Sequence, residues 1–295
     1  MSNHNIFAGA FVDRSGHRRK DPEWLLAAAD SPESRFVPVW GDKCLASGEP
    51  LRTVLLSRAE VADYLQFQET IFLGMYRGLP AFAVAIDSDL DAPFPDAGEF
   101  HDLRYLGSVL PVDEANLVAH ARALVLWHGL QKHCGVCGSL SKVESGGNTR
   151  ICSADDCGAQ IFPRVDPAII VLVSNGEQCL LGRQPAWPES RYSTIAGFVE
   201  PGESLEDAVR REVAEETNIV VGEVSYHSSQ PWPFPSSLML GFTAQANSSE
   251  IRLNDGELED AQWFTRKELR SGFPRLPYRL SIARRLVDNW LQRGP

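Results

Sequence analysis

The sequence has no long apolar run and little positive charge for its length. No window approaches the roughly 18 uninterrupted apolar residues that suggest a membrane-spanning helix. The first twenty residues lack the apolar core of a secretory signal peptide and end in the basic run 17–20. The formal net charge of −11 argues against indiscriminate nucleic-acid binding through counterion release. These absences predict a cytoplasmic protein with no membrane partner.

Positive charge is concentrated near the C-terminus. Residues 265–295 contain Glu268 and Asp288 against eight basic residues, which are Arg266, Lys267, Arg270, Arg275, Arg279, Arg284, Arg285 and Arg293. Two interpretations follow. Either this region forms a local basic edge, or the charges lie on the solvated face of a helix whose apolar side is buried.

Length and composition indicate a globular protein of more than one domain. The chain has 295 residues, of which 43% are hydrophobic and 23% charged. The pattern predicts an N-terminal α+β domain at 1–112, a linker helix at 113–133, a cysteine-bearing segment at 134–162 and a C-terminal α+β domain at 163–295. Strands are expected at 52–56, 71–76, 80–86, 168–173, 178–182 and 192–199.

Four of the six cysteines form two close pairs, Cys134 with Cys137 and Cys152 with Cys157. Since nothing suggests secretion, this spacing favours a tetrahedral zinc site over disulfides. Four thiolate ligands leave no position for substrate, so the zinc would be structural. A redox pair at the first two cysteines and a ribbon without metal are the alternatives.

Residues 197–219 read as a glycine-bracketed loop that runs into a helix. Ser204 is a natural N-cap, and the helical pattern extends to about Thr217. Three carboxylates, Glu212, Glu215 and Glu216, converge on one side of the helix, and two of them lie within its apolar stripe. Buried anions are costly unless they are paired or bind metal, so we expect a Mg²⁺ or Mn²⁺ site.

This stretch resembles the Nudix box. The residues in register with the family pattern are Gly197, Glu203, Arg211, Glu212, Val213, Glu215, Glu216 and Ile219. Asn218 departs from the family glycine, but asparagine is the usual substitute where a left-handed residue ends a helix. The resemblance implies hydrolysis of a nucleoside diphosphate linked to another group.

A second motif follows at residues 229–236, where prolines alternate with aromatics. Three prolines predict an extended, stiff loop outside any sheet. Such a loop would present Trp232 and Phe234 for stacking on a planar ring, although the two aromatics could also only cover the core.

A zinc ribbon, a Nudix box and this motif together resemble the NADH pyrophosphatase, or NudC-like, subfamily. The resemblance implies an N-terminal Nudix-like domain and a C-terminal α/β/α sandwich with a mixed sheet. It also implies a homodimer that uses two or three Mg²⁺ or Mn²⁺ ions and one structural Zn²⁺. The implied reaction splits NAD(H) into NMN(H) and AMP, and the same chemistry would convert NAD-capped RNA into NMN and 5′-monophosphate RNA.

The resemblance also assigns roles to individual positions. Glu215 would be the general base, acting with Glu212 and Glu216, while Glu203 and Arg211 would form a structural ion pair. The implied ligands of the catalytic metal are Ala196, through its carbonyl, and Glu212, Glu215, Glu216 and Glu257, with Glu259 and Asp260 as rivals to the last. The implied substrate contacts are Arg104, Phe162, Phe198, Ser229, Gln230, Pro231, Trp232, Pro233, Phe234, Pro235, Ser236 and Ala283.

Two of the transferred positions depart from the subfamily. Phe162 stands where tyrosine is common, so a hydroxyl is missing. Gly147 falls where the family has a substrate-contacting glutamate, and we expect no contact there. Two other functions compete with NAD(H) hydrolysis: a Nudix diphosphatase acting on ADP-ribose or dinucleoside polyphosphates, and a non-catalytic nucleotide-binding module.

Overall fold

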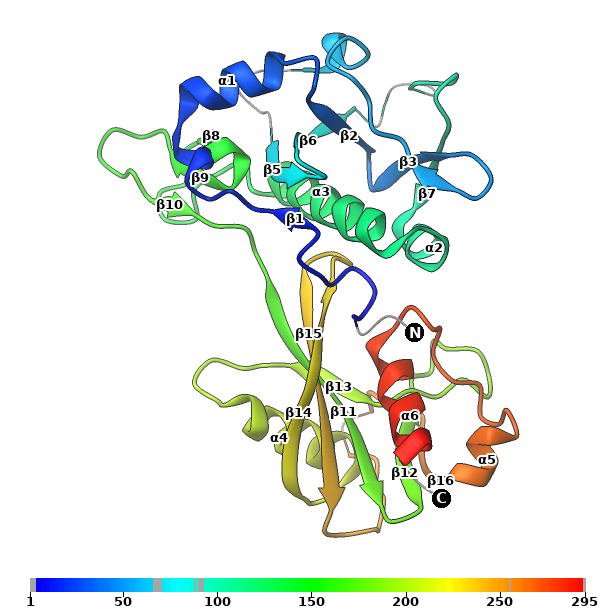
Figure 1. Ribbon diagram of the computed structural model, residues 1–295. Coiled ribbons are helices and arrows are strands. Elements are labelled where there is room, and N and C mark those ends of the chain that lie inside the picture. Colours follow the sequence, from blue (N-terminus) through cyan, green and yellow to red (C-terminus); the bar gives the residue numbers. More distant parts are fainter. Residues whose placement is uncertain (1–3, 66–70, 88, 90–92, 255, 294–295) are drawn as a thin grey trace. The chain divides into compact units, whose positions relative to one another are not determined.

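The computed structural model describes residues 4–65, 71–87, 89, 93–254 and 256–293, and the chain divides into two compact units (Figure 1). The N-terminal unit comprises Phe7–Arg164 together with Pro233–Ser236. The C-terminal unit comprises Met1–Ile6, Val165–Trp232 and Ser237–Pro295. The four paired cysteines therefore lie in the N-terminal unit, and the loop and helix of the Nudix box lie in the C-terminal unit.

The N-terminal unit is built on a mixed sheet in the order β1-β5-β6-β2-β3-β4, with β7 paired to β3. Its strands are β1 (Val12–Asp13), β2 (Arg35–Trp40), β3 (Lys43–Ser47), β4 (Arg52–Thr53), β5 (Ile71–Tyr76), β6 (Leu79–Ile86) and β7 (Glu99–Asp102). Its helices are α1 (Pro22–Asp30), α2 (Leu103–Val109) and α3 (Val112–Leu130), with 3-10 turns η1 (Arg18–Lys20) and η2 (Ala62–Tyr64).

Helices α1 and α3 cover opposite faces of this sheet (Figure 1). Because side chains alternate along a strand, Phe36 and Phe82 pack on the α1 side, and Cys44 on β3 faces α3, with its sulfur 3.9 Å from the Val118 carbonyl oxygen. The sequence suggests a linker at 113–133. Instead, α3 is a core helix of the N-terminal unit, with buried side chains along its length.

The cysteine-bearing segment folds into a three-stranded sheet of β8 (Ser141–Glu144), β9 (Thr149–Cys152) and β10 (Gln160–Ile161), with the turn η4 (Ser145–Gly147) between β8 and β9. The buried Arg150 attaches this sheet to the end of α3. Its guanidinium donates to the Ser141 hydroxyl at 2.8 Å and carbonyl at 2.7 Å, and contacts His128 Nδ1 at 2.9 Å. The segment thus belongs to the N-terminal unit.

The C-terminal unit is a mixed sheet between helices, in the order β14-β15-β11-β12-β16 with β13 paired to β11. Its strands are β11 (Asp166–Asn175), β12 (Gln178–Arg183), β13 (Ile195–Phe198), β14 (Val221–Trp232), β15 (Ser237–Ala246) and β16 (Asp260–Thr265). Its helices are α4 (Leu205–Thr217), α5 (Arg266–Arg270) and α6 (Ile282–Arg293). Strands β11 and β15 run parallel, and the other pairs are antiparallel.

Strand β11 is buried on both faces and separates two cores. Ile169 and Val171 pack with Val209 of α4 on one side, whereas Ile170 and Leu172 pack against α6 on the other. This arrangement confirms the α+β class and the α/β/α sandwich. The strands expected at 71–76, 80–86, 168–173 and 178–182 are confirmed as β5, β6, β11 and β12. No helix in the described ranges is both long and apolar enough to span a membrane.

Candidate active site

The helix of the Nudix box is α4, and both of its ends are capped. The Ser204 hydroxyl accepts from the Asp207 N–H at 3.2 Å and donates to the Asp207 carboxylate at 2.7 Å. At the other end Asn218 has a left-handed φ of 62°, and its N–H donates to the Ala214 carbonyl at 2.8 Å. Asparagine therefore takes the conformation for which the family uses glycine.

Gly197, at the end of β13, lies directly against the carboxyl group of Glu212. A Cβ at Gly197 would lie 1.9 Å from Glu212 Cδ and 2.0 and 2.2 Å from its two oxygens. A side chain at this position fits only if the Glu212 carboxyl group moves away. Gly197 therefore lets a carboxylate of α4 approach β13, the strand that also carries Ala196.

Arg211 organises three of the acidic side chains. Its guanidinium binds both oxygens of Glu203, at 3.1 and 2.6 Å. The same group donates to Glu212 at 2.9 Å, to Glu215 at 3.0 Å and to the Phe198 carbonyl at 2.9 Å. Charge-assisted bonds of this kind are strong and directional. Arg211 therefore fixes the loop and two carboxylates of α4 in one arrangement.

The charge of Glu212 is only partly compensated. Burial raises the pKa of its carboxyl above the usual range, Arg211 opposes this, and the charges of Glu215 and Glu257 raise it again. Glu216 on the same helix is 5% exposed, whereas Glu215 is exposed. A cation would favour the charged form of these groups.

The three acidic candidates after β15 have different surroundings. Glu259 forms an ion pair with Arg183 at 2.6 Å. Asp260 accepts hydrogen bonds from the Tyr192 hydroxyl and, at 2.7 Å, from Gln262. Glu257, by contrast, acts on the pKa of Glu212 through its charge. Of the three, Glu257 is therefore the one shown to interact with Glu212 of α4 through its charge.

The paired cysteines are close enough to share one ion. Their four sulfurs all lie within 4.8 Å of one another, with Cys134 and Cys157 3.9 Å apart and Cys137 and Cys152 3.3 Å apart. A tetrahedral site with Zn–S bonds of about 2.3 Å requires sulfurs about 3.8 Å apart. The donor set and spacing fit zinc. Among the described residues this is the one group of three or more His, Cys, Asp or Glu side chains that meets so closely.

The proline-aromatic motif is a hairpin tip rather than an extended loop. Residues 229–232 continue β14 and pair with β15, with Pro231 opposite Leu238. The expectation that the prolines exclude this stretch from a sheet is wrong for Pro231, because β14 is an edge strand and an edge tolerates a residue without an N–H. Residues 233–236 form the turn.

Gln230 within this motif is fully buried. Its side-chain amide donates to the Ile6 carbonyl at 3.1 Å and the Leu280 carbonyl at 2.8 Å, and its oxygen accepts from the Ile282 N–H at 2.8 Å. These bonds tie β14 to the start of α6. The side chain of Gln230 is thus engaged with backbone groups inside the C-terminal unit.

Two arginines of the N-terminal unit hold the turn at 233–236. The Arg104 guanidinium lies 4.0 Å from the ring centroid of Phe234, and that of Arg122 lies at 5.2 Å. Arg122 is buried and also donates to the carbonyls of Pro233 and, at 2.6 Å, Asp42. The sequence provides no signal for Arg122, because an arginine on a helix is normally solvated. Arg104 and Phe234, both expected to touch substrate, here touch each other.

The remaining expected substrate contacts differ in accessibility. Phe162 and Phe198 are exposed, at 64% and 61%, and can present their rings to a ligand. Ala283 is 1% exposed in α6, and the Ser229 carbonyl accepts from the Asn5 side chain at 2.7 Å. Gly147 has a φ of 81°, and a Cβ there would meet Ile71 Cα at 2.8 Å. A family-type glutamate would not fit at that position.

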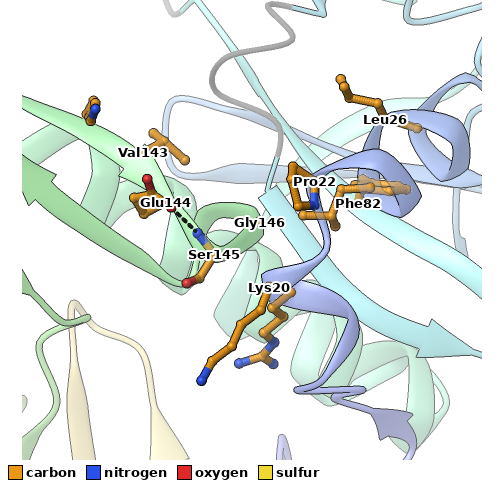
Figure 2. A pocket seen from close by; sticks show the side chains of 12 residues that line it. Lys20, Pro22, Leu26, Phe82, Val143, Glu144, Ser145 and Gly146 are labelled. Carbon is orange, nitrogen blue, oxygen red and sulfur yellow. Dashed lines mark hydrogen bonds between the residues drawn. The ribbon is translucent and has the colours of Figure 1, made fainter.

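A separate groove of about 740 Å³ lies in the N-terminal unit between α1 and β8 (Figure 2). Lys20 and Pro22 line it from one side, with Phe82 beside Pro22, and Val143 and Glu144 line it from the other side. None of the expected site residues line this groove. Its volume alone therefore does not connect it with the chemistry of α4.

Comparisons with known proteins place this geometry in a family. A NUDIX domain matches residues 164–288, and an NADH pyrophosphatase-like rudimentary NUDIX domain matches residues 33–127. The human NAD-capped RNA hydrolase NUDT12 is 35% identical over 99% of this chain and 74% of its own length. The NAD-capped RNA hydrolase NudC of Mycobacterium bovis (strain BCG / Pasteur 1173P2) is 37% identical over 95% of this chain and 92% of its own length.

The NudC of Stutzerimonas stutzeri (strain A1501), also named an NAD-capped RNA hydrolase, is 40% identical over 75% of this chain and 77% of its own length. A solved NUDIX hydrolase from Nitrosomonas europaea is 19% identical, with a TM-score of 0.46, over 55% of this chain and 91% of its own length. The identity to full-length relatives, together with the two matched domains, shows that the chain belongs to the Nudix hydrolase family, in its NudC-like group.

Proposed function

We propose that this protein is a metal-dependent diphosphatase that hydrolyses NAD(H) to NMN(H) and AMP. By the same bond cleavage it removes NAD caps from RNA, giving NMN and 5′-monophosphate RNA. The contact between Gly197 and the Glu212 carboxylate, with Arg211 holding Glu203 and Glu215 around it, is the observation that carries the proposal. The names of the NudC and NUDT12 relatives support the choice of substrate.

Mg²⁺ or Mn²⁺ ions are proposed to bind at the carbonyl of Ala196 and the carboxylates of Glu212, Glu216 and Glu257. Hard oxygen donors suit these ions, and because burial raises the pKa of Glu212, a bound cation would stabilise its charged form. Bound there, the ions would neutralise the diphosphate and acidify the attacking water. Among the three acidic candidates after β15, Glu257 is favoured because Glu259 is paired with Arg183.

Glu215 is proposed as the general base. It is exposed on α4, and its hydrogen bond to Arg211 fixes the direction of its carboxylate. A base in that position takes the proton from water as the new bond to phosphorus forms, a role typically contributing about 10² to 10⁴-fold to the rate. Arg211 and Glu203 position this group and do not contact the reacting atoms.

Within the C-terminal unit, the substrate is proposed to stack on the exposed ring of Phe198 and to contact the end of β14 at Trp232. Gln230 would contribute by anchoring β14 to α6. A structural Zn²⁺ on the four paired cysteines is supported by their sulfur spacing. We further propose that the protein is a homodimer and acts in the cytoplasm.

The test compares hydrolysis of NADH and ADP-ribose by the purified protein with Mg²⁺ or Mn²⁺. We expect NMNH and AMP as products and a clear preference for NADH. Equal rates on the two compounds would contradict the proposed specificity. Glu216→Gln should abolish Mn²⁺-dependent hydrolysis, and Glu206→Gln, which changes an exposed glutamate of the same helix, should not. Wild-type activity of Glu216→Gln would overturn the metal assignment.

A further inference from the structure

The segment between α5 and α6, residues 272–281, combines basic and exposed aromatic side chains. It contains Arg275 and Arg279 and no acidic residue. Phe273 and Tyr278 are 56% and 69% exposed, so their rings are accessible to a ligand. Positive charge beside exposed rings is the composition of surfaces that bind single-stranded nucleic acid.

Arg191 completes this surface from a neighbouring loop. Its guanidinium lies 4.4 Å from the Tyr278 ring centroid and donates to the Tyr278 hydroxyl at 3.0 Å. The two segments are also joined through their backbones: the Tyr192 N–H donates to the Arg275 carbonyl at 3.0 Å, and the Arg275 N–H donates to the Ser190 carbonyl at 2.7 Å. The surface formed by Arg191, Phe273, Arg275, Tyr278 and Arg279 is called the 272–281 surface below.

Arg275 and Arg279 differ from two of the other basic residues near the C-terminus. Arg266 is paired with Glu177, and Arg284 is paired with Asp288. Arg275 and Arg279 are exposed, and neither forms an ion pair with any residue in the described ranges. Their charge is therefore available to a ligand.

Two acidic residues, one close to the 272–281 surface in sequence and one bonded to Tyr192, have other partners. Glu268 caps α5 by accepting from the Thr265 N–H at 2.8 Å. Asp260 accepts from Tyr192 and Gln262. Glu189 lies two residues before Arg191 in the sequence, and the surface itself contributes three arginines. The surface is thus locally positive on a chain whose formal net charge is −11.

The 272–281 surface is fixed to both halves of the candidate site within the C-terminal unit. At one end Leu280 accepts a hydrogen bond from Gln230 of the proline-aromatic motif at 2.8 Å. At the other end the backbone bonds of Arg275 reach Ser190 and Tyr192, just before β13 with Ala196 and Gly197. The 272–281 segment is therefore hydrogen-bonded both to the proline-aromatic motif and to the residues that lead into β13.

We propose that the 272–281 surface binds the RNA body that follows an NAD cap. Bases stack on Tyr278 and Phe273, and backbone phosphates lie against Arg275 and Arg279. This inference rests on the proposed function, because RNA is a partner only if the protein removes caps. Free NADH has no such extension, so the surface contributes nothing to its hydrolysis.

The experiment measures binding of a 12-nucleotide single-stranded RNA bearing a 5′-monophosphate, a product that the enzyme does not consume. Removing both charges with R275Q/R279Q should weaken RNA binding about 10-fold. It should also reduce the magnitude of the slope of log K against log salt concentration by about 1.4, because each phosphate contact to a single strand contributes about 0.7 to that slope. Tyr278→Ala should weaken binding with an unchanged salt slope, because it removes stacking and no charge.

The matched control is R210Q/R252Q, which removes two arginines from the same unit that are already paired with Asp207 and Glu250. It should leave RNA binding unchanged. In turnover assays R275Q/R279Q should lower kcat/KM for NAD-capped RNA about 10-fold and keep that for NADH within about 2-fold. An unchanged salt slope, or equal loss in the control, would overturn the inference. Failure of the wild type to cleave any NAD compound would instead refute the proposed function.

Discussion

Replacing Gly197 by alanine tests whether the Glu212 carboxylate can keep its position only when residue 197 has no side chain. The added Cβ would lie 1.9 Å from Glu212 Cδ, so the carboxyl group must move about 1.5 Å to reach the 3.4 Å at which ordinary contact begins. That shift breaks the 2.9 Å bond from Arg211, and a charge-assisted bond is worth about 1.5–3 kcal/mol. Because a displacement of about 1 Å in a catalytic group can cost about 10²-fold, we expect kcat/KM for NADH to fall at least that much.

The assay is steady-state release of AMP, with thermal unfolding measured in parallel. Gly16→Ala is the control, because a Cβ at that loop glycine meets nothing within 4 Å, and it should keep wild-type activity. The double variant Gly197→Ala/Glu212→Ala should be as stable as Glu212→Ala alone, since the clash has been removed. Wild-type kcat/KM in Gly197→Ala, with an intact fold, would refute the steric argument.

Four further predictions concern other residues. Arg122→Ala should raise KM for NADH about tenfold with little change in kcat, because the turn at 233–236 loses the hydrogen-bond donor to the Pro233 carbonyl. Arg122→Lys should recover part of this loss. Equal KM values in Arg122→Ala and the wild type would show that the turn does not depend on Arg122. Glu257→Gln should weaken Mn²⁺ activation about 10-fold or more and Glu259→Gln should not, as titrations of activity with Mn²⁺ will reveal. Elemental analysis of the purified protein should find one zinc ion per chain. Cys137→Ser should lower both the zinc content and the thermal stability. A wild-type protein without zinc would contradict the proposed zinc site. Burial and the hydrogen bond to Asp260 raise the pKa of Tyr192 to about 12. The contribution of Tyr192 to the free energy of unfolding is therefore complete below the unfolded pKa of about 10 and is lost as pH rises through the folded pKa. Between about pH 9 and about pH 11, urea unfolding should show a smaller loss of stability in Tyr192→Phe than in the wild type.

The Nudix box could be predicted closely because its signals are local. A capping serine, the spacing of three glutamates and an asparagine at the helix end depend on neighbouring residues, and the fold retains them in α4. The strands β5, β6, β11 and β12 are equally local, since each is a short apolar run between turn residues.

The less predictable features depend on which segment pairs with which. Pro231 was expected outside any sheet, but only the topology reveals that β14 is an edge strand. The position of α3 between two domains in the sequence suggests a linker. In the fold α3 is a core helix, because the second face of the N-terminal sheet buries its apolar side chains against it. The motif around Gln230 predicts a substrate contact, but in the fold its side chain is hydrogen-bonded to the backbones of Ile6, Leu280 and Ile282. Arg122 acquires its role only through a turn more than a hundred residues away.

The central claim is tested most directly by the products formed from NAD-capped RNA. Wild-type protein with Mg²⁺ or Mn²⁺ should release NMN and leave RNA with a 5′-monophosphate, as separated by chromatography and identified by mass, and Glu216→Gln should leave the cap intact. Release of nicotinamide in place of NMN, or an intact cap under conditions where ADP-ribose is hydrolysed, would contradict the account.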